Sequence, residues 1–215
     1  MNTLNRIVFE APRVVMVLVV STLVLAGCAT TEPSRARANV ETTDDVGFTI
    51  TEDARVSGGV RTDYQLALDY LQQGRHAEGV ALLESVAAEA PRLSAPRIDL
   101  GIAYHRAGDL DAAERNLLLA LEANPGHPVA LNELGIVYRK TGRFAQARAS
   151  YESALAVYPN LHYARRNLAV LCDLYLSDLA CALDNYEAYM TTVPSDDEAS
   201  IWISDIRARL GQAAE

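Results

Sequence analysis

The chain has 215 residues, half of which are hydrophobic, and a formal net charge of −9 at pH 7. This length and composition allow one domain with a continuous hydrophobic core. Binding to nucleic acid is not expected, because the chain is acidic and its sequence has no basic stripe with interleaved aromatic residues.

Residues 1–27 are expected to form a secretory signal peptide. Arg6 and Arg13 flank the start of a Val- and Leu-rich run at residues 14–25, and small residues follow it. A positively charged start, a short apolar run and small residues before a cleavage site are typical of such signals. The run has about 12 residues, whereas a helix that spans a bilayer needs roughly 20. A permanent transmembrane helix is therefore the weaker interpretation.

The sequence Leu-Ala-Gly-Cys at residues 25–28 resembles the lipobox of bacterial lipoproteins. The resemblance implies that the chain is cleaved before Cys28 and that this cysteine carries the lipid. Ala29 follows in place of the aspartate associated with inner-membrane retention, so an outer-membrane lipoprotein facing the periplasm is favoured. Acyl chains add about 0.8 kcal/mol per buried methylene group, so a multiply acylated cysteine would anchor the chain firmly. The alternative is an ordinary signal peptide followed by an incidental cysteine.

Residues 28–59 are interpreted as the lipidated cysteine and a flexible tether. The segment is rich in Thr, Glu, Arg, Ser and Gly and has no sustained helical period. Within it, residues 46–51 alternate apolar and polar side chains, which is typical of a β-strand. Two interpretations of residues 46–51 follow: an extended loop, or a strand that packs on the first repeat or on a partner.

A repeat with a period of 34 residues follows the tether. A period in this range is typical of a solenoid of stacked helical hairpins. The repeated glycine can take the left-handed conformation that ends a first helix, and the repeated proline cannot continue the second helix. The recurring residues are Leu66, Leu100, Leu134 and Leu168; Tyr70, Tyr104 and Tyr138; Gly74, Gly108 and Gly142; and Pro91, Pro125 and Pro159.

The pattern Leu-Gly-x-x-Tyr, then Ala-x-x-x-Tyr, then Pro at residues 134–159 resembles the tetratricopeptide repeat. The resemblance covers about 135 residues. It implies an all-α fold, a right-handed α-solenoid of four helix-turn-helix repeats. The expected repeats are residues 60–93, 94–127, 128–161 and 162–194.

The fourth repeat departs from the pattern. Its Ala182, Tyr186 and Pro194 come one residue later than the period predicts, so one residue is inserted between Cys172 and Ala182. Leu176 occupies the position of the turn glycine. We expect the hairpin to form with an altered turn.

Residues 195–211 are expected to form a capping helix. The sequence Ser-Asp-Asp-Glu at residues 195–198 predicts a helix start with a capping box and an acidic first turn. A solenoid needs a terminal helix with one apolar and one polar face. Trp202 is interpreted as packing against the last repeat rather than as a binding residue. The apolar face consists of Ala199, Trp202, Ile206 and Leu210.

Two cysteines, Cys172 and Cys181, remain after Cys28 is set aside. Both lie at the same distance from the tip of the fourth hairpin, so a pair of antiparallel helices would bring them opposite each other. An even number of cysteines in an oxidising periplasm favours a disulfide. Two small buried thiols are the alternative.

No catalytic site, metal site or cofactor is expected. The four histidines are scattered through turns and helix ends, with no pair at metal-ligand spacing on one helix. The sequence has no Gly-rich phosphate loop, no Gly-x-Ser-x-Gly motif and no zincin motif. We therefore predict that the protein is not an enzyme.

The first helix of each repeat is expected to carry the functional residues, because this helix lines the groove in the resembled family. The mixture of aliphatic and polar residues suits an amphipathic helix or an extended peptide of a partner. The predicted groove residues are Tyr64, Leu68, Asp99, Ile102, His105, Asn132, Ile136, Arg139, Tyr163, Arg166, Asn167 and Val170.

Two alternatives bear on this groove. The aliphatic row, which consists of Leu68, Ile102, Ile136 and Val170, could instead pack between neighbouring first helices. Tyr64 and Leu68 also occupy the positions where chaperone-binding tetratricopeptide domains carry a Lys and an Asn. Recognition of a chaperone tail is therefore not expected.

The predicted function is a non-catalytic scaffold, anchored through its lipid, that positions another envelope protein. The plan resembles small repeat lipoproteins that help assemble pilus secretins or other outer-membrane machines. Residues 167–176 and 202–206 also resemble repeat proteins that accompany TonB-type systems. Neither resemblance selects a pathway, and the oligomeric state stays open. The alternative function is a structural spacer or self-associating module without a peptide groove.

Overall fold

The computed structural model describes residues 39–43, 47–51 and 56–212. The predicted signal peptide at residues 1–27 and the lipidation site Cys28 lie outside the described residues. Much of the predicted tether also lies outside them.

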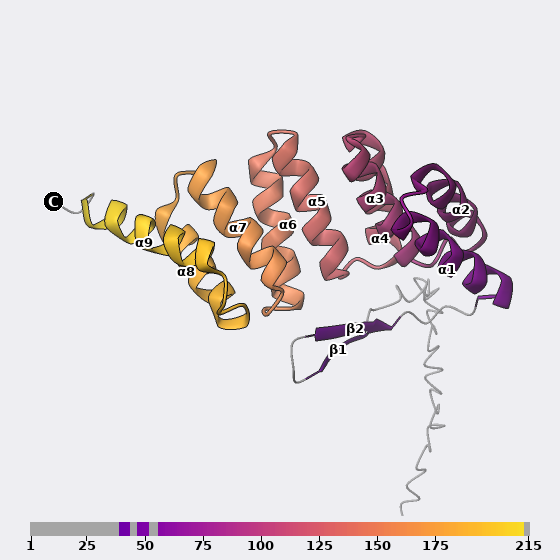
Figure 1. Ribbon diagram of the computed structural model, residues 1–215, viewed down its shortest axis with the longest axis horizontal. Coiled ribbons are helices and arrows are strands. Elements are labelled where there is room, and N and C mark those ends of the chain that lie inside the picture. Colours follow the sequence, from indigo (N-terminus) through magenta and orange to yellow (C-terminus); the bar gives the residue numbers. More distant parts are fainter. Residues whose placement is uncertain (1–38, 44–46, 52–55, 213–215) are drawn as a thin grey trace, which may run out of the picture. The chain divides into compact units, whose positions relative to one another are not determined.

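The described residues after the tether form nine α-helices, which follow one another in chain order from indigo to yellow in Figure 1. The first eight helices pair into four hairpins, which we number one to four. The helices are α1 (Gly58–Gln72), α2 (His76–Glu89), α3 (Ala95–Ala107), α4 (Leu110–Ala123), α5 (Pro128–Lys140), α6 (Phe144–Val157), α7 (His162–Leu174), α8 (Leu179–Thr192) and α9 (Asp197–Gln212).

Each hairpin packs against the next one in the chain. The second helix of a hairpin contacts the first helix of its successor, in the pairs α2–α3, α4–α5 and α6–α7, and α8 contacts α9. Neighbouring first helices also contact each other, in the pairs α3–α5 and α5–α7. The predicted α-solenoid is thereby confirmed. The contacts between first helices place them on the inner side of the stack.

The two helices of a hairpin approach closely where the first helix has a glycine. A Cβ added to Gly135 would lie 2.5 Å from Cε1 of Tyr151, and a Cβ added to Gly101 would lie 2.6 Å from Cγ of Leu117. Tyr151 and Leu117 are both fully buried. The glycines therefore leave room for the large core side chain of the partner helix, which explains why a residue that costs about 0.5–1 kcal/mol in a helix interior occurs there.

The turns of the first three hairpins share one backbone conformation. Gly74, Gly108 and Gly142 have φ angles of 76°, 85° and 76°, in the left-handed region that favours glycine. In hairpin four the residue in this region is Ser177, with φ 55°. The 34-residue period predicts Leu176 at this position. The inserted residue moves the left-handed position one residue along the chain.

Part of the predicted tether has regular structure. Strands β1 (Asn39–Thr43) and β2 (Gly47–Thr51) form a two-stranded antiparallel sheet in which Val40 is paired with Ile50 and Thr42 with Phe48. The extended loop is therefore the wrong interpretation for residues 47–51, and their strand character is confirmed, but β2 pairs with β1 rather than with the first repeat or a partner. The sequence did not indicate the partner strand β1. Both strands are rich in Val, Ile and Thr, whose branched side chains favour a pleated sheet.

Helix α9 packs on α8 and ends the stack. The Asp196 carboxylate accepts a hydrogen bond from the Ala199 amide at 3.0 Å, so Asp196 caps the helix rather than Ser195. The Tyr189 hydroxyl donates to the same carboxylate at 2.7 Å. The ring centroids of Trp202 and Tyr186 lie 5.3 Å apart, so Trp202 contacts the last hairpin. Among the described helices, none has the length and apolar character needed to cross a membrane.

Candidate partner-binding groove

A cavity of about 260 Å³ lies on the first helices of hairpins one and two. Three of the predicted groove residues, Leu68, Asp99 and Ile102, line it together. Arg106 lines the same cavity, although it is not among the predicted groove residues. The complete lining consists of Leu68, Leu71, Gln72, His76, Asp99, Ile102, Ala103 and Arg106.

The predicted aliphatic row is half-buried along its whole length. Ile136 and Val170 pack against the large core, and Ile102 packs against a smaller cluster that contains Ile98 and Ala130. Ile102, Ile136 and Val170 therefore contribute to packing, and all four side chains keep accessible surface. The row can support the stack and still present an apolar floor to a partner.

Asp99 is held in the groove by a neighbouring hairpin. The Tyr64 hydroxyl donates a hydrogen bond to Asp99 Oδ2 at 2.5 Å, which joins α1 to α3. Burial raises the pKa of the Asp99 carboxyl, and the Tyr64 hydrogen bond and the charge of Arg106 oppose this rise. The carboxylate is thus already partnered within the chain.

Asn132, Glu133 and Asn167 form a second polar connection, between hairpins three and four. Asn167 Nδ2 donates to Asn132 Oδ1 at 3.0 Å, and Asn132 Nδ2 donates to Glu133 Oε1 at 3.2 Å. Burial raises the pKa of Glu133, and the Asn132 hydrogen bond and Arg106 oppose this rise. Two predicted groove residues, Asn132 and Asn167, therefore hold neighbouring first helices in register.

His105 lies between the first helices of hairpins two and three. Its Nδ1 atom is 4.0 Å from Glu133 Oε2. Burial lowers the pKa of His105, and the charges of Lys140, Arg106 and Arg139 lower it further. This shift favours the neutral imidazole, and in that form the contact with Glu133 is not an ion pair.

The remaining predicted residues lie toward hairpin four and α9. Arg139 donates to the Tyr175 hydroxyl at 3.5 Å, a long hydrogen bond. The Arg166 guanidinium lies 5.1 Å from the centre of the Trp202 ring and 3.5 Å from Glu198. Tyr163 is 63% exposed. The sequence analysis did not assign Tyr175 and Trp202 to the groove, although each contacts a predicted groove arginine.

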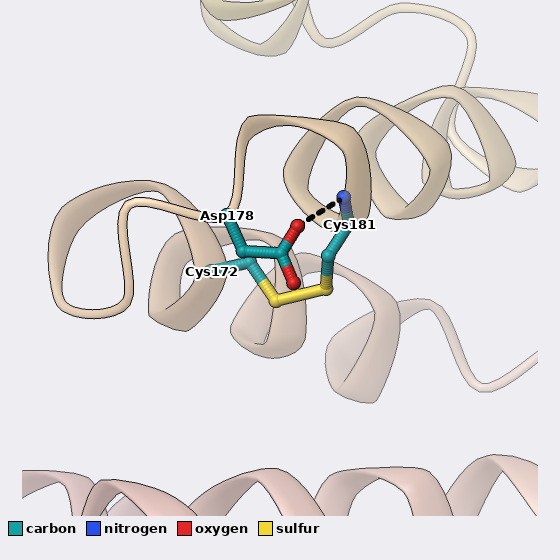
Figure 2. Close-up of side chains that lie close together, drawn as sticks. All are labelled: Cys172, Asp178 and Cys181. Atoms are coloured by element: carbon teal, nitrogen blue, oxygen red, sulfur yellow. Dashed lines mark hydrogen bonds between the residues drawn. A yellow bond between two sulfur atoms is a disulfide. The ribbon is translucent and has the colours of Figure 1, made fainter.

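Cys172 and Cys181 form a disulfide, with an S–S distance of 2.04 Å (Figure 2). The Asp178 carboxylate lies beside it and accepts a hydrogen bond from the Cys181 amide at 3.1 Å. Ligand atoms of these three residues lie within 4.8 Å of one another. The two sulfur atoms are bonded to each other, however, and metal ions bind thiolates. The oxidised chain therefore has no metal site here.

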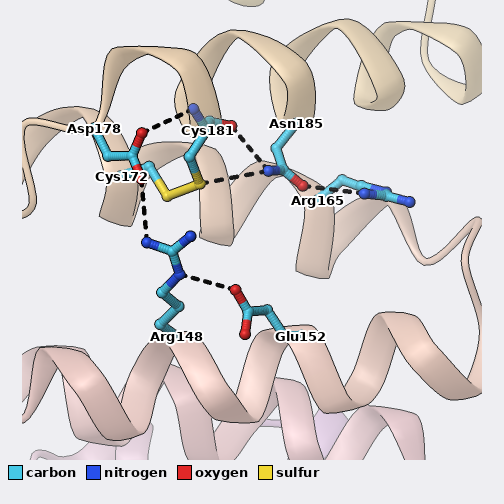
Figure 3. Close-up of polar contacts among 7 residues, drawn as sticks. All are labelled: Arg148, Glu152, Arg165, Cys172, Asp178, Cys181 and Asn185. Atoms are coloured by element: carbon cyan, nitrogen blue, oxygen red, sulfur yellow. Dashed lines mark hydrogen bonds and ion pairs between the residues drawn. A yellow bond between two sulfur atoms is a disulfide. The ribbon is translucent and has the colours of Figure 1, made fainter.

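Polar contacts surround the disulfide (Figure 3). Arg148 of α6 donates to Asp178 at 3.1 Å and to Glu152 at 2.8 Å. Asn185 donates to the Cys181 carbonyl at 2.8 Å. Asp178 therefore has a structural role: it connects the turn of hairpin four to Arg148 of hairpin three.

Models of the tetratricopeptide repeat family match residues 60–85 and 92–160. These hairpins are tetratricopeptide repeats. Such repeats serve as scaffolds for protein–protein interaction, and their fold is typically non-catalytic.

Curated relatives share the repeats over part of their length. Anaphase-promoting complex subunit CDC16 of Saccharomyces cerevisiae is 27% identical over 97 residues, which are 45% of this chain and 12% of that protein. Photosystem I assembly protein Ycf3 of Prochlorococcus marinus is 33% identical over 84 residues, which are 39% of this chain and 43% of that protein. The chain thus matches less than half of each relative.

Solved structures of other tetratricopeptide proteins have the same fold. MamA from Desulfovibrio magneticus RS-1 superposes with a TM-score of 0.64 at 18% identity, over 73% of this chain and 88% of MamA. PilF from Pseudomonas aeruginosa gives a TM-score of 0.64 at 18% identity, over 71% of this chain and 69% of PilF. The first repeat domain of RPAP3, bound to an HSP90 peptide, gives 0.52 at 22% identity, over 55% of this chain and 95% of that domain. These similarities establish the fold.

Proposed function

We propose that this protein is a non-catalytic scaffold, anchored to the bacterial outer membrane through a lipid on Cys28, that positions an envelope protein in an assembly, secretion or transport complex. Its first helices bind a peptide or an amphipathic helix of that partner. The observation that carries the proposal is the cavity lined by Leu68 and Ile102, which combines an aliphatic floor with polar walls.

Two further points support peptide binding. Neighbouring first helices are held together by the Asn167–Asn132 and Tyr64–Asp99 hydrogen bonds, so the groove is preformed and a ligand need not order it. The RPAP3 repeat domain, which has the same fold, is described as bound to the HSP90 peptide SRMEEVD. A chaperone tail is not proposed here, because Tyr64 and Leu68 replace the Lys and Asn of the chaperone-binding pattern.

Anchoring is proposed from the sequence at residues 25–28 and its place after a short apolar run. Metabolic labelling with palmitate tests it. We expect label on the wild-type chain and none on the C28A variant, with the labelled chain in the outer-membrane fraction. Labelling of C28A, or an unlabelled wild-type chain, would contradict the anchor and leave the groove proposal untouched.

The groove is tested by replacing Ile102 and Ile136 together with aspartate. Because both side chains are half-buried, circular dichroism must first show that the helical content is unchanged. We then expect crosslinking in cells to lose the partner that the wild-type chain captures. L66D is the matched control. Leu66 also lies on a first helix, α1, but it is 39% exposed and does not line the cavity formed by Leu68 and Ile102.

Two results would favour the alternative function. If I102D/I136D unfolds, the aliphatic row is essential core, and the single variant I102N must then decide the binding question. If the folded variant still captures the same partner, the groove is not the binding surface. A spacer or self-associating module is then the better description, and the mass of the wild-type complex distinguishes the two.

A further inference from the structure

Two exposed cations occupy equivalent places near the ends of the first helices of hairpins two and three. Arg106 lies in the last turn of α3 and Lys140 ends α5, and the two residues are 34 positions apart, so they occupy the same place in consecutive repeats. Helices α3 and α5 contact each other. Neither side chain forms an ion pair within the part of the chain that the structure describes.

Three other arginines have partners that join the hairpins. Arg143 pairs with Glu114, Arg148 with Asp178, and Arg209 with Asp173. These three arginines therefore help to hold neighbouring hairpins and helices together. Arg106 and Lys140 differ from these three arginines because they are exposed and form no ion pair among the described residues.

Two acidic groups lie near these cations but are less exposed than they are. Asp99 and Glu133 occupy equivalent positions, again 34 residues apart, and each accepts a hydrogen bond from a groove side chain, Tyr64 or Asn132. Burial raises the pKa of both carboxyls. Asp99 and Glu133 are half-buried, whereas Arg106 and Lys140 are exposed, so the two cations are the more accessible charges at this part of the groove.

The aliphatic floor runs directly beside these cations. Ile102 precedes Arg106 by four residues, and Ile136 precedes Lys140 by four, which is about one helical turn in each case. Arg106 and Ile102 line the same cavity. Two consecutive repeats therefore present the same pair of features, an apolar site and a cation.

A cation in the last turn of a helix also interacts favourably with the helix dipole, by about 0.3–1 kcal/mol. That role needs no ligand. It also does not require the cation to adjoin an accessible apolar residue, so it accounts for the charge but not for the pairing with the floor.

We infer that the partner segment is acidic: it places two carboxylates against Arg106 and Lys140 and aliphatic side chains against Ile102 and Ile136. This inference rests on the proposed groove function. Packed helices are about 8–10 Å apart, so the two carboxylates must be separated by a similar distance, and a segment with one acidic residue engages only one repeat.

A peptide selection tests the inference. A phage-displayed library of random 12-residue peptides is screened on the immobilised full chain, and the selected peptides are measured by fluorescence polarisation. The test variant is R106E/K140E. The matched control is R92E/R115E, which changes the formal charge equally at exposed residues outside the cavity lined by Ile102.

We expect the selected peptides to be rich in Asp, Glu and aliphatic residues. Their affinity should fall at least tenfold in R106E/K140E, change less than threefold in R92E/R115E, and weaken as salt shortens the screening length. Peptides that need Ile102 and Ile136 but bind R106E/K140E normally would overturn the acidic partner and leave the groove function standing.

Failure of the proposed function itself gives a different result. If the wild-type chain selects no peptide beyond those selected by folded I102D/I136D, the groove function and the acidic partner both fall. Binding to phosphatidylglycerol vesicles that is lost in R106E/K140E, with no peptide selected, would assign the cations to a lipid surface and also overturn the inference.

Discussion

Hairpins three and four stabilise the turn between their two helices in different ways. Hairpin three closes its turn with Gly142 in the left-handed conformation, φ 76°. Hairpin four has a longer turn with Ser177 at φ 55° and a disulfide between Cys172 and Cys181. The two hairpins otherwise bury equivalent tyrosines, Tyr151 and Tyr186.

The difference teaches that a repeat tolerates loss of its turn residue when another constraint replaces it. A left-handed residue with a Cβ costs roughly 1–2 kcal/mol, whereas glycine takes this conformation freely. A disulfide that closes a short loop contributes about 2–3 kcal/mol in the chain-entropy account. The covalent bond therefore more than offsets the less favourable turn.

The largest expected effect comes from the core of hairpin three. Tyr151 is fully buried against Gly135, so Y151A should lower the free energy of unfolding by about 3–5 kcal/mol. Urea denaturation measures this, and Y163A, at a tyrosine that is 63% exposed, is the matched control with little change.

A double-mutant cycle sharpens this prediction. G135A should destabilise the wild type, because its Cβ would meet the Tyr151 ring at 2.5 Å. In the Y151A background the same change should stabilise, since the ring is gone and alanine favours the helix by about 0.5–1 kcal/mol. Equal effects in both backgrounds would show that the two residues are not coupled.

The disulfide is expected to have the next largest effect. C172A/C181A should lose about 2–3 kcal/mol of stability, because the unfolded chain is no longer constrained. Reductant should destabilise the wild type by a similar amount and leave the double variant unchanged. A wild-type chain with two freely labelled thiols before reduction would contradict the bond.

The two turns give a pair of opposite predictions. G142A should destabilise by about 1 kcal/mol through the backbone alone, because a Cβ there meets no atom within 4 Å. S177G should stabilise hairpin four by up to about 1 kcal/mol, and more visibly in the C172A/C181A background. Thermal melts of the four variants test this, and equal signs for the two substitutions would refute the comparison.

The smallest expected effect concerns the ion pair of Arg143 with Glu114, which joins hairpins two and three. The Arg143 hydrogen bond lowers the pKa of Glu114 from 4.5, so the pair stabilises the fold above this pH, and the contribution is lost as the pH falls through the folded pKa. E114Q should cost about 0.2–1 kcal/mol at pH 7. Urea titrations should show this difference shrinking below pH 4.5; a constant difference would exclude the charge as its cause.

The 34-residue period was sufficient to predict the helical hairpins, because each repeated position has a steric role that the sequence displays. Gly135 admits Tyr151, and Gly142 takes the left-handed turn. The approach of Cys172 to Cys181 also followed from the antiparallel geometry of a hairpin.

Other features depend on information that the period does not contain. The insertion could be located only between Cys172 and Ala182, so Leu176 rather than Ser177 was aligned with the turn glycine. Strand β1 was missed because its residues match a polar tether in composition. Arg106 was missed because its role depends on which side chains share a cavity, although its 34-residue relation to Lys140 was visible in the sequence.

The disulfide also bears on when the molecule acquires its final form. Through Tyr175, the turn it closes touches Arg139, a predicted groove residue on the preceding hairpin. In a reducing cytosol this turn would lack its crosslink, whereas an oxidising compartment would complete it. We therefore expect reduction of the disulfide to loosen the turn that contacts Arg139.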